Sequence, residues 1–107
     1  MKAVRIQRFG GPDQVVLENV PVPVAGAGEI LIHVRAAGVA PWDALIREGK
    51  SKVSPQPPLT LGSDLAGVVE AVGANVVGIS AGDVRCMEPP ILNFAERRLS
   101  MQWRRRE

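Results

Sequence analysis

The stretch Leu61–Gly73, LGSDLAGVVEAVG, is the clearest indication of the fold. Most of it, from 64 to 72, consists of small and β-branched residues, which suit the pleated surface of a strand. Glycine, alanine and asparagine then follow at 73–75, a combination typical of a turn. This stretch is therefore predicted to be a β-strand that ends in a turn.

Three further strands are predicted on the amino-terminal side of this stretch. Alternating side chains predict strands over 2–8 and 15–20, and the glycine-rich turn 10–13 between them predicts a hairpin. The longest strand is expected over 30–39. Within it, Gly38 is expected to mark a bulge or a close approach between two backbones.

One short helix is predicted over 41–49, because proline suits the first helical turn and glycine suits the position just past the end. A polar, proline-rich loop is expected over 50–59. Several short strands, turns at intervals of about ten residues and one short helix together predict a mainly β fold, a small and partly open β-barrel.

Length and composition exclude several classes of protein. The chain has 107 residues, which is room for one domain. Its single cysteine, Cys86, excludes an internal disulfide and a multi-cysteine zinc site. No stretch approaches the roughly 18 apolar residues of a membrane span, and the charged start at 1–5 is unlike a secretory leader. We therefore expect a cytoplasmic protein without a membrane partner.

The positive charge of the chain is concentrated at its end. From Glu96 onward the sequence has five arginines and two glutamates, which gives this segment a net charge of +3. Because the whole chain has a net charge of +2, the residues before Glu96 have a net charge of −1. A nucleic-acid partner would depend on this end alone, and we expect none.

Five blocks of sequence occur in an order and spacing that resemble a known superfamily. They are similar to the amino-terminal half of the medium-chain, alcohol-dehydrogenase-like dehydrogenases and reductases, and most similar to the zinc-free quinone-oxidoreductase and zeta-crystallin branch. The resemblance implies a GroES-like domain over 1–84, with the active site in the cleft between it and a Rossmann domain. The blocks are 1–4, 9–13, 26–34, 36–43 and 61–73.

The resemblance also bears on metal and cofactor. Zinc-dependent members of the superfamily place a cysteine and a histidine ligand where this chain has Ala40 and Ser63. Neither a methyl group nor a hydroxyl replaces those ligands, so no zinc is expected. Without a Lewis acid to polarise a carbonyl, the resemblance implies direct hydride transfer from NADP(H) to an electron-poor quinone or enone. The zinc-free branch commonly has asparagine where Ala40 stands, and alanine lacks that hydrogen-bonding side chain.

The resemblance places five residues at the cleft: Ala40, Trp42, Asp43, Ser63 and Asp64. Asp43 is expected to stabilise the start of the helix, where a carboxylate interacts favourably with the helix dipole, with contact to substrate or cofactor as the alternative. Trp42 is expected either to line the cleft or to pack. No catalytic residue is assigned. The chain has no dinucleotide-binding glycine motif, so the Rossmann domain would hold most of the NADP(H).

The segment 85–107 does not match the superfamily and is predicted to be a basic, non-family tail. Translated in a shifted frame with a suitable choice of codons, it can give the superfamily's continuation. This suggests the hypothesis that the sequence from about residue 84 onward is a frameshift product. The alternative is a genuine basic tail that contacts RNA or an anionic membrane.

Two functions from different classes follow for the rest of the chain. In the first, it is the amino-terminal catalytic-domain fragment of a zinc-independent, NADP(H)-dependent quinone or enone oxidoreductase, inactive on its own because the Rossmann domain is missing. The complete enzyme would then be a homodimer, as is common in the superfamily. In the second, it is a stand-alone GroES-like module for binding or oligomerisation, without catalysis.

Overall fold

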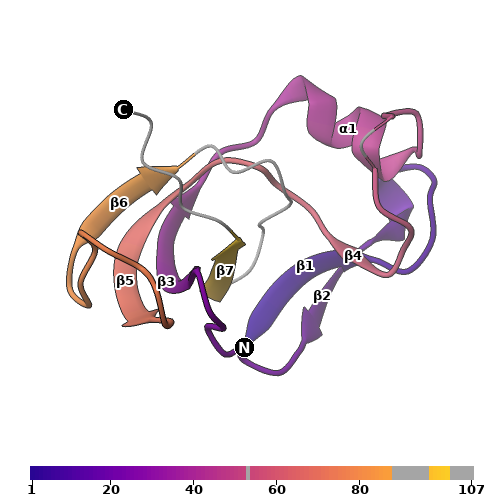
Figure 1. Ribbon diagram of the computed structural model, residues 1–107. Coiled ribbons are helices and arrows are strands. Elements are labelled where there is room, and N and C mark those ends of the chain that lie inside the picture. Colours follow the sequence, from indigo (N-terminus) through magenta and orange to yellow (C-terminus); the bar gives the residue numbers. More distant parts are fainter. Residues whose placement is uncertain (53, 88–96, 102–107) are drawn as a thin grey trace.

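Two antiparallel sheets with a helix beside them make up the computed structural model, which describes residues 1–52, 54–87 and 97–101 (Figure 1). The three-stranded sheet has the order β2-β1-β4 and the four-stranded sheet the order β6-β5-β3-β7. The two sheets share no strand in this part of the chain, so they do not close into a barrel. The predicted mainly β fold with one helix and an open barrel is confirmed.

The three-stranded sheet contains the predicted hairpin. β1, Lys2–Ile6, pairs antiparallel with β2, Val15–Asn19, and a 3-10 turn at Pro12–Gln14 lies just before β2. The other edge of β1 pairs with the two-residue strand β4, Leu59–Thr60. β1 is therefore the central strand, although its second partner comes more than 50 residues later in the sequence.

The four-stranded sheet is built around the two strongest strand predictions. β3, Glu29–Ala37, pairs antiparallel with β5, Leu65–Val72. The edge strands are β6, Val84–Met87, on β5, and β7, Arg97–Met101, on β3. These two edge strands were not predicted, because the segment 85–107 was expected to be a tail without strand character.

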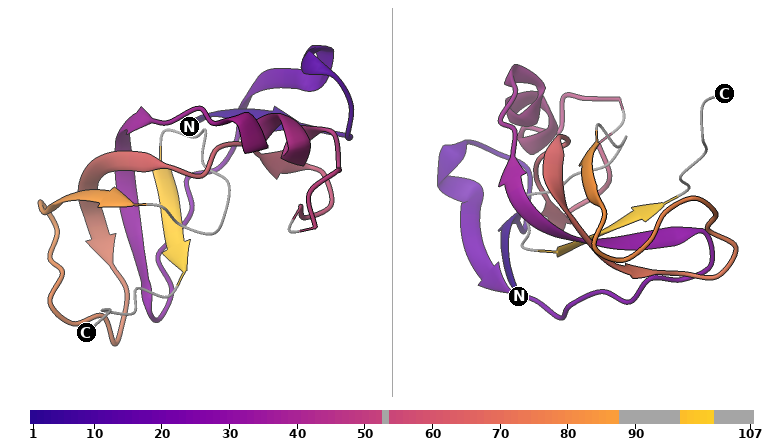
Figure 2. Two further views of the ribbon diagram at one scale, coloured as in Figure 1. Left: turned by 90° about the horizontal axis from the view of Figure 1, so that it is seen from above. Right: turned by 90° about the vertical axis from the view of Figure 1, so that its left-hand side faces the viewer.

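Each sheet has an apolar core of its own, and the views in Figure 2 show the two sheets side by side with the helix at one end. The four-stranded sheet buries one cluster, and the three-stranded sheet buries another against the helix. The first cluster is Ile30, Ile32, Leu65, Val69 and Ile79. The second is Ile6, Ile46, Leu59 and Leu61, with Phe9 packed against it.

Helix α1, Pro41–Arg47, is anchored to the loop between β1 and β2. The Arg47 carbonyl oxygen accepts a hydrogen bond from the Gly10 N–H at 3.0 Å, and Arg47 Nε donates to the Gly10 carbonyl oxygen at 3.1 Å. Gly49 follows the helix with φ +74°, and a side chain there would meet the ring of Phe9 at 2.9 Å. The loop thus fixes the carboxyl end of α1.

No helix within the described ranges is long and apolar enough to cross a membrane.

Candidate functional site

The five residues predicted at a cleft lie on two neighbouring segments. One segment runs from the end of β3 into α1 and carries Ala40, Trp42 and Asp43, and the other leads into β5 and carries Ser63 and Asp64. The segments are joined where the Gly38 N–H donates to the Asp64 carbonyl oxygen at 3.0 Å. A methyl group at residue 38 would lie 3.2 Å from Asp64 Cβ, so the backbone approach predicted at this glycine is confirmed.

Asp43 is buried at the first turn of α1, with 6% of its surface exposed. Its Oδ2 accepts a hydrogen bond from the Ala40 N–H at 2.8 Å, and its own N–H donates to the Ala40 carbonyl oxygen at 3.1 Å. This is half of a capping box, because the alanine at the N-cap has no side-chain acceptor to complete it. The capping contribution predicted for Asp43 is therefore present. Its Oδ1 is buried without a hydrogen-bond partner among the described residues.

Trp42 is hydrogen-bonded to the second segment through the only polar atom of its side chain. The indole Nε1–H donates to Ser63 Oγ at 2.9 Å, and the Ser63 hydroxyl donates in turn to Asp64 Oδ1 at 3.4 Å. Trp42 nevertheless keeps 49% of its surface exposed. The indole is thus held at its nitrogen and half exposed, and both alternatives left by the sequence, lining a cleft or packing, stay predictions.

An open groove of about 710 Å³ lies beside these residues. Of the five predicted cleft residues only Asp64 lines it, and Asp64 is the one charged side chain among its described lining residues. Trp42 is joined to the groove through Ser63. The other lining residues are Ala36, Ala37, Gly38, Leu65, Ala66 and Cys86.

Most of these lining residues were missed from the sequence. Ala66 and Cys86 are paired across β5 and β6, which brings the thiol to the groove from the segment expected to be a tail. The signal that could have pointed to the groove is the run of small residues at 36–38, because small side chains at the end of a strand leave room for a ligand.

The site offers little to a metal ion. Within the described ranges, no three histidine, cysteine, aspartate or glutamate side chains are grouped so that they could hold one. At the two positions that correspond to zinc ligands, Ala40 presents a methyl group, and the Ser63 hydroxyl is engaged with Trp42 and Asp64. A carboxylate and small or apolar side chains remain around the groove.

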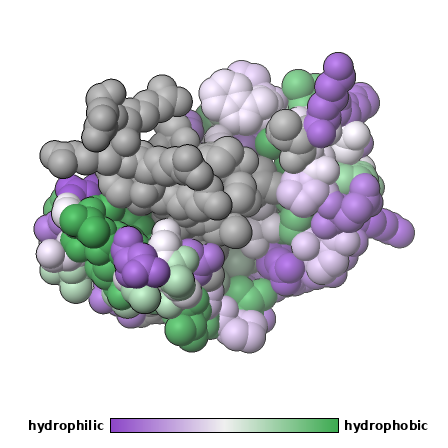
Figure 3. Space-filling view, viewed as in Figure 1, coloured by the Kyte–Doolittle hydropathy of each residue, from purple (hydrophilic) through white to green (hydrophobic). Residues whose placement is uncertain are grey.

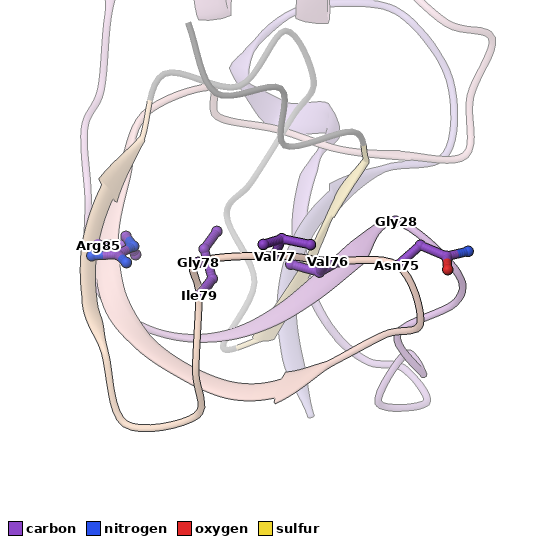
Figure 4. Close-up of a pocket in the computed structure, with 7 residues that line it drawn as sticks. All are labelled: Gly28, Asn75, Val76, Val77, Gly78, Ile79 and Arg85. Atoms are coloured by element: carbon purple, nitrogen blue, oxygen red, sulfur yellow. The ribbon is translucent and has the colours of Figure 1, made fainter. Parts of the chain in front are cut away.

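A second hollow of about 580 Å³ lies between the turn after β5 and the start of β6. Figure 4 shows the side chains of Arg85 and Asn75 at its two ends with Val76 and Val77 between them. Arg85 Nη2 forms an ion pair with Asp83 Oδ2 at 2.8 Å. Hydrophobic side chains gather at the lower left of the face seen in Figure 3. Val77, which lines the hollow, and Val84 are both exposed. None of the predicted cleft residues borders this hollow.

Comparisons with known proteins agree on the type of domain. Residues 26–98 match the family model of the alcohol dehydrogenase GroES-like domain. The pig (Sus scrofa) quinone oxidoreductase is 43% identical to the chain over 84 residues, which is 78% of this chain and 26% of that protein. The chain therefore spans about a quarter of the length of this relative.

Two solved structures show the same fold. The human synaptic vesicle membrane protein VAT-1 homolog-like protein superposes with a TM-score of 0.88 and 32% identity, over 92% of this chain and 32% of its own. The Escherichia coli quinone oxidoreductase complexed with NADPH superposes with a TM-score of 0.86 and 26% identity, over 94% of this chain and 31% of its own.

Proposed function

Because the chain belongs to the alcohol dehydrogenase GroES-like domain family, we propose that it is the amino-terminal catalytic domain of a zinc-independent, NADP(H)-dependent oxidoreductase that reduces quinones or enones. The observation that carries this proposal is the 43% identity to a quinone oxidoreductase, together with the gathering of the predicted cleft residues at one corner of the fold. The proposal includes a cytoplasmic homodimer whose contacts lie largely in the nucleotide-binding domain.

Independence from zinc is supported by the chemistry of two side chains. A methyl group cannot ligate zinc, and a neutral serine hydroxyl is not among its usual protein ligands. The Ser63 hydroxyl is moreover already hydrogen-bonded to Trp42 and Asp64. A quinone or an enone suits such a site, because its conjugated carbonyl is already electron-poor and accepts a hydride without a Lewis acid.

The groove fits only one end of a dinucleotide. Its small side chains leave room for a flat ring, but the carboxylate of Asp64 would repel a phosphate, and no described lining residue carries a positive charge. When bound, NADP(H) supplies the hydride. Residues 36–38 and 64–66 would border the nicotinamide or the acceptor and exclude water there, while the phosphates would be held by another domain.

A chimera tests the proposal. Residues 1–84 would replace the matching segment of the pig quinone oxidoreductase, and NADPH oxidation would be followed with a quinone acceptor. We expect quinone-dependent turnover that is unchanged after treatment with a zinc chelator. A folded chimera that binds NADPH but does not turn over would contradict the proposal and favour a binding or oligomerisation module.

The 107-residue chain gives a second test. Since the described groove lining offers no cation to a phosphate, we expect no measurable NADPH binding and no turnover by the chain alone. Calorimetric titration with NADPH measures this directly. Saturable binding would show that the chain itself holds the dinucleotide and would overturn this part of the proposal.

A further inference from the structure

Trp42 is an exposed aromatic side chain in a chain with few aromatic residues. The sequence contains two tryptophans, two phenylalanines and no tyrosine. Trp42 leaves 49% of its surface in contact with solvent, although burial of so large a side chain is strongly favourable. Leu45, three residues later on the same helical face, is also 49% exposed. The outer face of α1 therefore presents an apolar surface, and Trp42 is hydrogen-bonded to Ser63, the sequence neighbour of the groove residue Asp64.

The hydrogen bond to Ser63 limits what this surface can recognise. Nε1–H is the only hydrogen-bond donor of an indole, and at 2.9 Å from Ser63 Oγ it is already satisfied. The exposed part of Trp42 is consequently hydrocarbon and π-electron surface. The bond also joins α1 to the segment before β5, 21 residues away, so it restricts rotation of the ring. A restricted ring favours the stacking of a flat molecule, whereas aliphatic contacts need no particular orientation of the ring.

From these observations we infer that Trp42, held in position by Ser63, is the surface that selects acceptors with a flat conjugated ring over acceptors without one. An electron-rich indole face pairs favourably with an electron-poor quinone ring in an offset stack. The groove residues Ala36, Ala37 and Gly38 leave space beside such a ring. This inference rests on the proposed function for the class of acceptor. It adds that ring-bearing quinones, and not acyclic enones, are the preferred substrates.

Binding of two probes to the 107-residue chain tests the inference. Anthraquinone-2-sulfonate is a flat quinone, and cyclohexanesulfonate has the same charge on a saturated ring. The indole N–H signal of Trp42 is followed by ¹⁵N NMR, with Trp103→Phe to identify it, since the chain has only these two tryptophans. We expect a saturable upfield shift with the quinone and no shift with the saturated sulfonate. Equal shifts with both probes, or no shift with either, would overturn the inference.

Variants distinguish aromatic stacking on Trp42 from nonspecific hydrophobic binding. Trp42→Phe keeps an aromatic face but has no N–H to donate to Ser63, so it should bind the quinone about as well as Ser63→Ala and more tightly than Trp42→Leu. Trp42→Leu keeps an apolar side chain without the face and should bind about two- to tenfold more weakly. Val77→Ala removes a side chain that is 87% exposed and remote from the groove, and should change nothing. Binding to Trp42→Leu as tight as to the wild type would contradict the inference, provided that circular dichroism shows both chains folded.

Ser63→Ala tests the positioning contribution. Without its hydroxyl partner the indole is free to turn, so we expect weaker quinone binding while the Trp42 signal still responds to the probe. Unchanged binding would remove Ser63 from the inference. The assay contains no NADPH and no hydride transfer. Selective binding with an inactive chimera would therefore overturn only the proposed function, and an active chimera without selective binding would overturn only this inference.

Discussion

The two halves of the molecule are held together in different ways. The four-stranded half rests on a long backbone ladder between β3 and β5 and on five buried apolar side chains. The three-stranded half has a two-residue strand at one edge, a four-residue core and a helix hydrogen-bonded through Arg47 to Gly10. The candidate site lies where the halves meet. Asp64 and the groove belong to the four-stranded sheet, while Trp42 belongs to the helix and depends on the contacts that hold the helix in place.

The largest effect is expected from Gly67→Ala in the four-stranded half. A methyl group at Gly67 would lie 2.4 Å from the His33 carbonyl oxygen, and neither backbone can move without breaking the β3–β5 ladder. We expect a loss of about 3 kcal/mol or more of unfolding free energy in denaturant titrations. The control is Gly26→Ala, where the nearest atom, at 3.2 Å, is at the end of the flexible Glu29 side chain. Equal losses for both variants would show that the ladder is not what Gly67→Ala disrupts.

A slightly smaller effect is expected in the three-stranded half. Ile46 is 6% exposed and packs in the core beneath α1, so Ile46→Ala should cost about 2 to 3 kcal/mol of unfolding free energy. Leu45→Ala, at the half-exposed neighbouring position, should cost less than about 1 kcal/mol. Thermal unfolding with both variants measures the difference. Should the two cost the same, the helix would not depend on this core.

The junction between the halves is probed by Asp43→Ala. It leaves the Ala40 N–H without its acceptor, so we expect a loss of about 1 to 2 kcal/mol of unfolding free energy. Asp43→Asn keeps an acceptor oxygen and should lose less. Asp13→Ala, an exposed aspartate at the short turn before β2, serves as the matched control with little expected change. A loss for Asp13→Ala as large as for Asp43→Ala would argue against a special contribution of the cap.

The smallest effect concerns the end of the helix. Lys50 lowers the pKa of Glu48 from its ordinary 4.5 by a hydrogen bond and by its charge, with a further contribution from Arg47. Because the pKa is lower in the folded chain, this contribution to stability is present above about pH 4.5 and is lost as the pH falls through the lowered pKa. Lys50→Ala should raise the pKa of Glu48 in a ¹³C NMR titration, whereas Lys52→Ala should leave it unchanged. A Glu48 pKa that is the same in all three chains would contradict this pairing.

Local sequence signals predicted the elements that depend on local interactions. The β1–β2 hairpin, α1 and β5 follow from alternation, proline and glycine positions, and turn residues close by in the chain. Strict alternation places Leu31 on the opposite side of the strand from Ile30 and Ile32, yet all three are buried. The pairing of β3 with β5 shifts register between Leu31 and Ile32, and such a shift depends on the partner strand rather than on the alternation itself.

The strands β6 and β7 could not be predicted, because their pairing depends on edges supplied by distant parts of the chain. The candidate site likewise contains residues that the sequence predicted and residues that depend on long-range strand pairing. The resemblance pointed to five residues, of which Asp64 lines the groove, but Cys86 reaches the groove only through the pairing of β6 with β5. The match to the family model extends to residue 98, past the boundary expected at 84. The frameshift hypothesis for 85–107 stays a prediction, and the coding DNA tests it.

The wide separation of β3 from its partners along the sequence has a consequence for the newly made chain. After Ala37 has been synthesised, 27 more residues must be added before β5 begins at Leu65. At about 5–20 residues per second this takes roughly one to six seconds. A hairpin forms within about 1–10 μs, far less than this interval, so the pairing of β1 with β2 does not wait for β5. Throughout that interval Ile30, Leu31 and Ile32 have no strand to pair with. The domain is therefore most open to aggregation, and to capture by a chaperone, while it is still attached to the ribosome.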